Sequence, residues 1–206
     1  MERSLFGLPT LEEIDRQLNN PLSKTWALTL QDNLGANGGD LVDGTAYGNV
    51  LLFQPLLPVP VSEKLMFSGR PVFPLVTSPN VDSSTGETDG HTTGFGDLQL
   101  LTLVGPDKAG GWVWGAGATF KFPTTSDPRL GQGKYQAGPA AMVLHMGRPW
   151  ILGFIAQHWS SFAGDDERSE TNFTDFQYII RYSLPGAWSV GMGPSITYNK
   201  EADRDD

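Results

Sequence analysis

The segment from Trp114 to Trp150, "WGAGATFKFPTTSDPRLGQGKYQAGPAAMVLHMGRPW", indicates the kind of fold. Both of its flanks alternate large and small residues with a period of two, which is typical of β-strands. An eleven-residue polar loop, Pro123–Gly133, separates the two runs, whereas the next connection, "GRP", has only three residues. This contrast between long and short connections recurs along the chain.

The alternation predicts nine strands, most of them eleven residues or longer. Strands of soluble domains have about 5–6 residues, whereas a tilted membrane-spanning strand needs about 9–11. Strand length therefore favours a membrane barrel. The predicted strands are Ser23–Leu34, Ala46–Leu56, Lys64–Val76, Gly94–Val104, Gly111–Phe122, Lys134–Met146, Trp150–Phe162, Asn172–Leu184 and Ala187–Asn199.

Long and short connections follow each other in strict alternation. The short ones are "PVPVSE", "GPDKA", "GRP" and "PG", and the long ones are Gly35–Thr45, Thr77–Thr93, Pro123–Gly133 and Ala163–Thr171. In an antiparallel meander all short turns then lie at one end and all long loops at the other, as in outer-membrane barrels with periplasmic turns and external loops. The sequence thus predicts an all-β, up-and-down antiparallel transmembrane β-barrel.

The faces of the last strands fit this fold without proving it. Trp188, Val190, Met192 and Ile196 alternate with small or polar residues, and so do Phe176, Tyr178 and Ile180. A membrane barrel turns such a face outward and a soluble sandwich turns it inward. Aromatic residues near strand ends favour the membrane, where they form interfacial girdles, although an amphipathic lid over a soluble core is the alternative. The girdle candidates are Trp26, Trp112, Trp150, Tyr182, Trp188 and Tyr198.

Composition narrows the function classes. The 206 residues carry 14 Lys and Arg against 23 Asp and Glu, a net charge of −9, and they include no cysteine. No nucleic-acid partner is expected from such an acidic chain. No apolar run approaches the roughly 20 residues of a membrane-spanning helix. The N-terminus, "MERSLFGLPTLEEIDRQ", has no apolar stretch of signal-peptide length.

One short helix is predicted at Thr10–Asn19, where Thr10 and Glu13 fit a capping box and Leu11, Ile14 and Leu18 share a face. We expect it at the periplasmic mouth or partly inside the barrel. The chain divides accordingly into an N-terminal segment, residues 1–22, and a barrel domain, residues 23–206.

Four motifs resemble one family of bacterial barrels. They are "GFGDLQL" (Gly94–Leu100), "WGAGATFKFPTTSDPRLGQGKYQAGPAAMVL" (Trp114–Leu144), "HWSSFAGDDERSETN" (His158–Asn172) and "YNKEAD" (Tyr198–Asp203). The chain resembles the MetA-pathway-of-phenol-degradation, transporter-like family. The resemblance implies a porin-like barrel of about twelve strands in the outer membrane of a Gram-negative bacterium, for passive uptake of small compounds, aromatic or apolar ones among them. It supplies no catalytic or ligand-binding residue.

The chain departs from that family at both ends. Bacterial single-chain barrels have an even number of strands and end in the periplasm. Nine predicted strands therefore lead us to expect an incomplete barrel, without its signal peptide and C-terminal strands, whose open edge must be covered or paired.

Polar residues at the predicted lumen positions are the functional candidates: Gln54, Arg70, Asp97, Gln99, Lys121, Gln136, Asp175, Gln177 and Arg181. They either form a path that selects solutes or brace the wall through salt bridges. If the two aspartates leave Arg70, Lys121 and Arg181 unneutralised, the path favours neutral and weakly anionic solutes over cations.

Catalysis, metals and cofactors are not expected. His91, His145 and His158 do not converge in this topology, and the acidic loop "GDDERSETN" lacks the spacing of a calcium loop. His158 with Ser160 or Ser161 and Asp165 would be the only triad, but no nucleophile elbow accompanies it. The expected partners are outer-membrane lipid or lipopolysaccharide and a small solute. The alternatives are a barrel that binds an apolar ligand without transport and an outer-membrane hydrolase.

Overall fold

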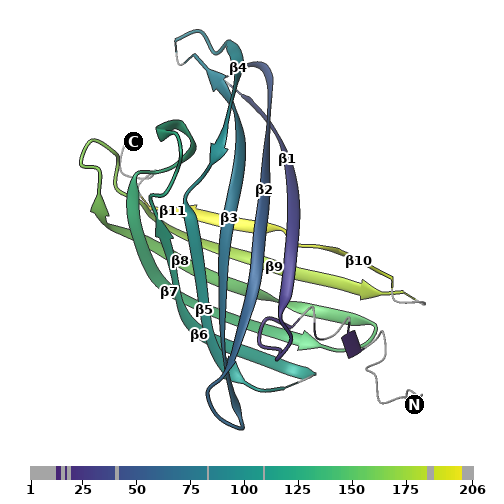
Figure 1. The fold of residues 1–206 in the computed structure, drawn as a ribbon. Coiled ribbons are helices and arrows are strands. Elements are labelled where there is room, and N and C mark those ends of the chain that lie inside the picture. Colours follow the sequence, from purple (N-terminus) through teal and green to yellow (C-terminus); the bar gives the residue numbers. More distant parts are fainter. Residues whose placement is uncertain are drawn as a thin grey trace.

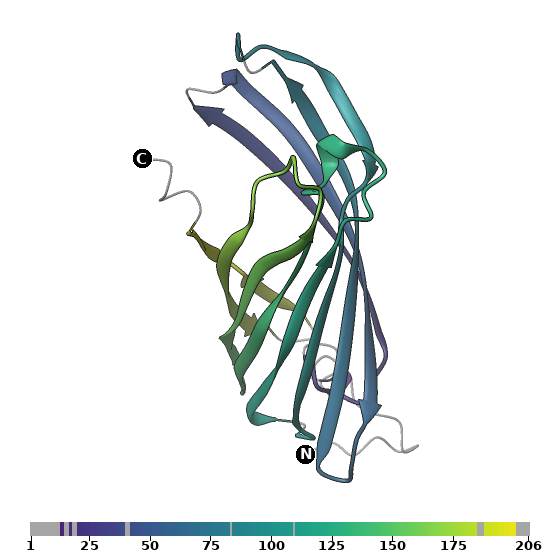
Figure 2. The same cartoon turned by 90° about the vertical axis from the view of Figure 1, so that its left-hand side faces the viewer.

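The chain forms one antiparallel sheet that curls into a half-barrel (Figures 1 and 2). The computed structural model describes residues 13, 14, 17, 20–39, 42–82, 84–108, 110–184 and 188–200. Each strand pairs with the strand before it in the chain, except β5, which pairs with β3, and β11, which pairs with β9; this is the predicted up-and-down arrangement. In the described part of the chain, β1 forms one edge of the sheet and β10 and β11 form the other.

In the described part of the chain, eleven strands form this sheet and one short 3₁₀ helix lies outside it. Their bounds are β1 Ala27–Gly39, β2 Val42–Pro60, β3 Leu65–Val81, β4 Thr88–Phe95, β5 Leu98–Pro106, β6 Gly111–Phe122, η1 Pro128–Leu130, β7 Lys134–Met146, β8 Trp150–Gly164, β9 Asn172–Ser183, β10 Ser189–Met192 and β11 Ser195–Asn199.

These eleven strands occupy nine positions in the sheet, as many as the predicted strands. β4 and β5 both pair with β3, along different parts of its length, and β10 and β11 both pair with β9. The fourth position is interrupted at Gly96 and Asp97, and the ninth at Gly193 and Pro194. Pro194 has no N–H to donate, but its carbonyl still accepts from the Tyr178 amide at 2.8 Å.

Two segments that the sequence predicts to be long loops are mostly strand in the structure. Most of Gly35–Thr45 lies in β1 and β2, which pair as far as Gly39 and Val42. Most of Thr77–Thr93 lies in β3 and β4, which pair as far as Val81 and Thr88. These stretches are polar and rich in glycine, so they resemble loops in composition. A ladder needs no apolar side chains, however, because the backbone supplies its hydrogen bonds.

The two faces of the half-barrel differ in character. Side chains on its outer, convex face are largely apolar and exposed, as at Trp114, Phe73 and Leu152. Side chains on its inner, concave face are buried or half-buried on the central strands and more exposed toward the two edges, and they change from apolar to polar along the strands. Because successive residues alternate between faces, each strand contributes to both surfaces.

The hydrophobic core lies on the concave face at the end where the short turns gather. It includes Leu22, Met66, Leu103, Val113 and Met142, all of them almost completely buried. Leu22 precedes the first strand and sits over two glycines of β5 and β6. A Cβ atom at Gly105 would lie 2.5 Å from Leu22 Cδ1, and one at Gly115 would lie 3.1 Å away. Because neither glycine has a side chain, Leu22 can pack directly against the sheet at this point.

The segment around Leu22 is fixed to the turn between β5 and β6. Asn20 Nδ2 donates to the Lys108 carbonyl at 2.9 Å, and Lys24 Nζ lies 2.6 Å from Asp107 Oδ2. Of the predicted helix Thr10–Asn19, the structure describes Glu13, Ile14 and Gln17, which are helical; the rest lies outside the described residues. Among the described residues, no helix has the length and apolar character needed to cross a membrane.

Candidate functional site

A belt of polar residues crosses the concave face beyond the core. Strand register places its members on one face, since Gln99 pairs with Lys121 and Lys121 pairs with Gln136. Arg70 pairs with the core residue Leu101 and so shares that face. All nine lumen candidates belong to this belt: Gln54, Arg70, Asp97, Gln99, Lys121, Gln136, Asp175, Gln177 and Arg181.

Lys121 is held by two aromatic rings. Its Nζ lies 4.6 Å from the ring centroid of Trp159 and 4.4 Å from that of Phe173. The two rings stack on each other with centroids 5.0 Å apart. A cation over an aromatic face is stabilised by the ring quadrupole. Asp97 and Asp175 act on Lys121 electrostatically, but neither forms an ion pair with it among the described residues. The aromatic contacts had no signal in the sequence, because they depend on strand register.

Asp97 anchors the long loop between β6 and β7. Its Oδ2 accepts from the backbone N–H of Gln132 at 2.7 Å, while its Oδ1 is buried without a hydrogen-bond partner. The Gln132 side chain in turn accepts from Gln136 Nε2. Leu130, in η1 of the same loop, is buried. The loop therefore folds back onto the concave face at the long-loop end.

The charged members of the belt form no salt bridges with one another. Among the described residues, no carboxylate lies within 4.0 Å of a cationic nitrogen of Arg70, Lys121 or Arg181. Asp175 Oδ1 instead accepts from Thr197 Oγ1 at 2.9 Å. Among the described residues, these side chains therefore do not pair with one another, and wall bracing through their salt bridges stays an untested alternative. One ion pair that the sequence analysis missed joins Nζ of the buried Lys134 to Oε1 of the exposed Glu170 at 3.0 Å.

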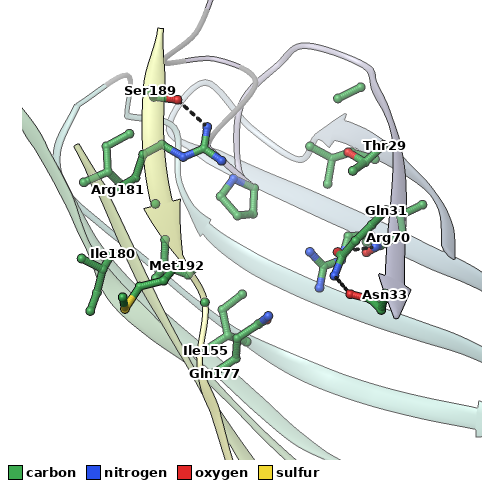
Figure 3. A pocket seen from close by; sticks show the side chains of 18 residues that line it. Thr29, Gln31, Asn33, Arg70, Ile155, Gln177, Ile180, Arg181, Ser189 and Met192 are labelled. Atoms are coloured by element: carbon green, nitrogen blue, oxygen red, sulfur yellow. Dashed lines mark hydrogen bonds between the residues drawn. The ribbon is translucent and has the colours of Figure 1, made fainter. Parts of the chain in front are cut away.

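A cavity of about 580 Å³ lies on the concave face between the two edges of the sheet (Figure 3). Residues from β1, β2 and β3 line one side, and residues from β8, β9 and β10 line the other. Four of the lumen candidates contribute to it: Gln54, Arg70, Gln177 and Arg181. Lys121, Gln99 and Gln136 do not, so the belt divides into two parts.

Hydrogen bonds order one side of this cavity. Gln54 Nε2 donates to Gln31 Oε1 at 3.2 Å, and Gln31 Nε2 donates to Asn33 Oδ1 at 2.8 Å. On the other side, Arg181 Nη1 donates to Ser189 Oγ at 3.4 Å. Arg70 Nε is buried without a hydrogen-bond partner. Figure 3 shows Arg70 beside Gln31 and Asn33, and Arg181 beside Ser189.

The six girdle candidates lie on the convex side, five of them near the short turns. Trp26, Trp112, Trp150 and Trp188 are exposed, and the Trp150 and Tyr182 rings have centroids 4.8 Å apart. Tyr198 is exposed near the opposite ends of the strands. It belongs to a second group of exposed aromatic residues, whose other members the sequence analysis missed: Tyr47, Phe95, Tyr135 and Phe162. Two of them, on β7 and β8, have ring centroids 6.3 Å apart.

The histidines lie apart from the belt. His91 lies on the β3–β4 hairpin, and its Nε2 is 3.0 Å from the carbonyl oxygen of Tyr47 on β2. The His145 ring packs against Trp112. His158 Nδ1 is 2.9 Å from Thr174 Oγ1 on the convex side. Among the described residues, no group of three His, Asp or Glu side chains is placed to hold a metal ion.

A comparison with family models gives a match over residues 26–206, almost the whole sheet and its connections, to the family described as "Putative MetA-pathway of phenol degradation". The chain belongs to this family. In this member of the phenol-degradation family, the antiparallel sheet forms a half-barrel with an apolar convex face and a polar belt on its concave face. Searches of curated proteins and of solved structures give no significant match.

Proposed function

We propose that this chain forms the wall of a β-barrel in the outer membrane of a Gram-negative bacterium and admits small compounds, aromatic or apolar ones among them, by passive diffusion. The distribution of charge between the two faces carries the proposal. From Tyr47 to Tyr198, the convex positions of β2, β3 and β5 to β11 hold no Asp, Glu, Lys or Arg. The concave positions hold Arg70, Lys121, Lys134, Asp175 and Arg181, of which Lys134 is paired with Glu170.

The cost of charge in lipid explains why this division favours a membrane. A Lys or Arg facing lipid near the midplane costs about 2–4 kcal/mol, and an acidic residue costs less. Asp32 on β1 is a charged residue on the convex face, and its carboxylate accepts from Asn49 Nδ2 at 2.7 Å. A soluble protein would have no reason to keep its solvent-facing side almost free of charge. Outer-membrane lipid or lipopolysaccharide is accordingly the proposed surrounding of the convex face.

The spacing of the two aromatic groups supports the same assignment. On β6, Trp112 of the first group is ten residues from Phe122, whose ring packs edge-on against Tyr135 of the second group with centroids 6.5 Å apart. Ten residues span about 33 Å of strand, which at a tilt of about 40° gives a height of roughly 25 Å. This equals the apolar band of about 25 Å that outer-membrane barrels present between their aromatic girdles.

The polar belt supports passage of a solute along the concave face. Three cations face two carboxylates there, and no ion pair joins them among the described residues. A path with this excess of positive charge favours neutral and weakly anionic compounds over cations.

Conductance of the full chain refolded into liposomes tests the proposal, with Arg70→Ala, Lys121→Ala and Arg181→Ala beside it. We expect a preference for anions that decreases in these variants and in high salt, where the Debye length falls below about 10 Å. Heat-modifiable migration in a gel controls for folding. A folded, detergent-free monomer that conducts nothing would contradict the proposal.

Binding of an apolar ligand without transport is the second candidate function. The core around Leu22 supports binding without transport, because its side chains fill the concave face at the short-turn end, where a transported solute would have to pass. Ligand binding in detergent combined with absence of conductance in liposomes would favour this candidate.

We propose no enzymatic activity. The arrangement of His158 supports this view, since its ring contacts Thr174 on the convex side rather than a serine nucleophile. Hydrolysis of an ester that is lost in His158→Ala would contradict it.

A further inference from the structure

We propose that the cavity between the two edges of the sheet binds a small carboxylate with an apolar body, through Arg70 and Arg181. The inference rests on the proposed function in that it names the class of solute. Binding at the cavity does not itself require conduction, so the two ideas fail separately.

The charge of the cavity is the first argument. Two guanidinium groups line it, and no Asp or Glu stands among its described lining residues. Lys121, the third cation of the belt, lies outside the lining and is held by the Trp159 and Phe173 rings. A cavity with two cations and no anion needs a negative partner.

The hydrogen-bonding capacity of the two arginines points the same way. A guanidinium has five N–H donors in a planar fork that matches a carboxylate. Arg70 Nε is buried without a partner, and Arg181 makes one long bond of 3.4 Å, to Ser189 Oγ. Most of their donors are therefore available to a ligand. The amides of Asn33 and Gln177 also line the cavity and add neutral polar contacts.

The apolar lining separates an organic acid from an inorganic anion. Leu56, Ile151, Ile155 and Ile179 contribute to the wall. Leu56, Ile151 and Ile155 are themselves almost completely buried, so they form an apolar floor beneath the cavity. An apolar body would pack against this floor, whereas sulfate or phosphate would gain nothing from it. The volume of about 580 Å³ lies within the range of about 300–1,000 Å³ that is usual for small-molecule sites.

Binding of phenylacetate to the full chain in detergent micelles, followed by calorimetry, tests the inference. Its neutral isostere phenylacetamide and the cation phenethylamine test the charge, hexanoate tests whether any apolar body suffices, and inorganic sulfate tests the apolar wall. We expect phenylacetate and hexanoate to bind at least about tenfold more tightly than the other three, the usual loss when a charged hydrogen bond is missing.

The arginines are tested by Arg70→Met and Arg181→Met, each of which should weaken phenylacetate binding about tenfold or more. Arg129→Met, in the exposed loop where the arginine pairs with Asp127, is the matched control and should leave binding unchanged. If Arg70→Met fails to fold, Arg70→Lys, which keeps the charge but loses the planar fork, should weaken phenylacetate binding by less than Arg181→Met does, and full affinity in Arg70→Lys and Arg181→Met together would count against the inference. Equal affinity for phenylacetamide, equal affinity for sulfate, or full affinity in both methionine variants would overturn the inference. Binding without conductance would overturn the transport proposal alone.

Discussion

Alternation in the sequence was enough to assign individual residues to the two faces of the sheet. A strand has a period of two, so Phe176 and Gln177 had to face opposite sides once the strand was recognised. The side chains that such residues contact could not be predicted from the sequence. Lys121 on β6 meets Trp159 on β8 and Phe173 on β9, and only the register of three strands brings them together. Sequence thus predicts the side that a residue faces better than the residues it contacts.

Leu22 shows how much one side chain outside the sheet contributes at the residue scale. It is completely buried, so Leu22→Ala should lower the free energy of unfolding by about 2–5 kcal/mol. Leu22→Met nearly conserves volume and should cost less than about 1.5 kcal/mol. Urea unfolding in detergent measures both changes.

Trypsin cleavage after Lys24 provides an independent reading, because release of Leu22 also loosens the contact between Lys24 and Asp107. Leu22→Ala should be cut faster than the parent chain. Equal unfolding free energies and equal cleavage rates in all three proteins would show that the segment does not anchor to the core.

At the scale of elements, polar and glycine-rich composition led to wrong predictions of loops, whereas the strands that reach the core were predicted correctly. Gly35–Thr45 and Thr77–Thr93 are polar, yet they extend the ladders of β1 with β2 and of β3 with β4. Pro123–Gly133 is a loop as predicted, but its attachment to Asp97 had no signal in the sequence. Hydrophobic periodicity identifies a strand only where one face is buried, so it is silent about hairpins in water.

The loop between β8 and β9 is tied to β7 by Glu170, which makes this connection sensitive to pH. Hydrogen bonds from Ser161 and then from Lys134 lower the pKa of Glu170 below its ordinary value. The bound form is the carboxylate, so its contribution to stability is present above the unfolded pKa of about 4.3 and is lost as pH falls through the lowered pKa. Lys134 is buried and loses its partner in acid.

We therefore expect Glu170→Gln to lower the urea midpoint at pH 7 and to have little effect near pH 3. Glu167→Gln, in the same loop, is the matched control and should not change the midpoint at pH 7. A Glu170→Gln effect that stays the same at both pH values would mean that the carboxylate does not act through its charge.

At the scale of the whole molecule, the strand order and an incomplete barrel were predicted from the sequence, whereas the residues that the curl brings together were not. Alternating connection lengths predicted a meander, and the meander is what forms. The curl places Asn33 of β1 and Ser189 of β10 around one cavity, although they lie at opposite edges of the sheet. Curvature arises from the accumulated twist of many strands, which no local pattern encodes.

The orientation of the two faces in lipid is the last prediction. The chain has no cysteine, so single cysteines can be introduced and labelled without background. Ile196 and Thr197 are neighbours on β11 that face the convex and concave sides, and Tyr178 and Gln177 are the corresponding pair on β9. If lipid covers the convex face as proposed, Ile196→Cys and Tyr178→Cys, labelled with an environment-sensitive dye, should be quenched by brominated acyl chains. Thr197→Cys and Gln177→Cys should be quenched by aqueous iodide instead. Quenching by iodide at all four positions would place both faces in water and contradict a membrane barrel.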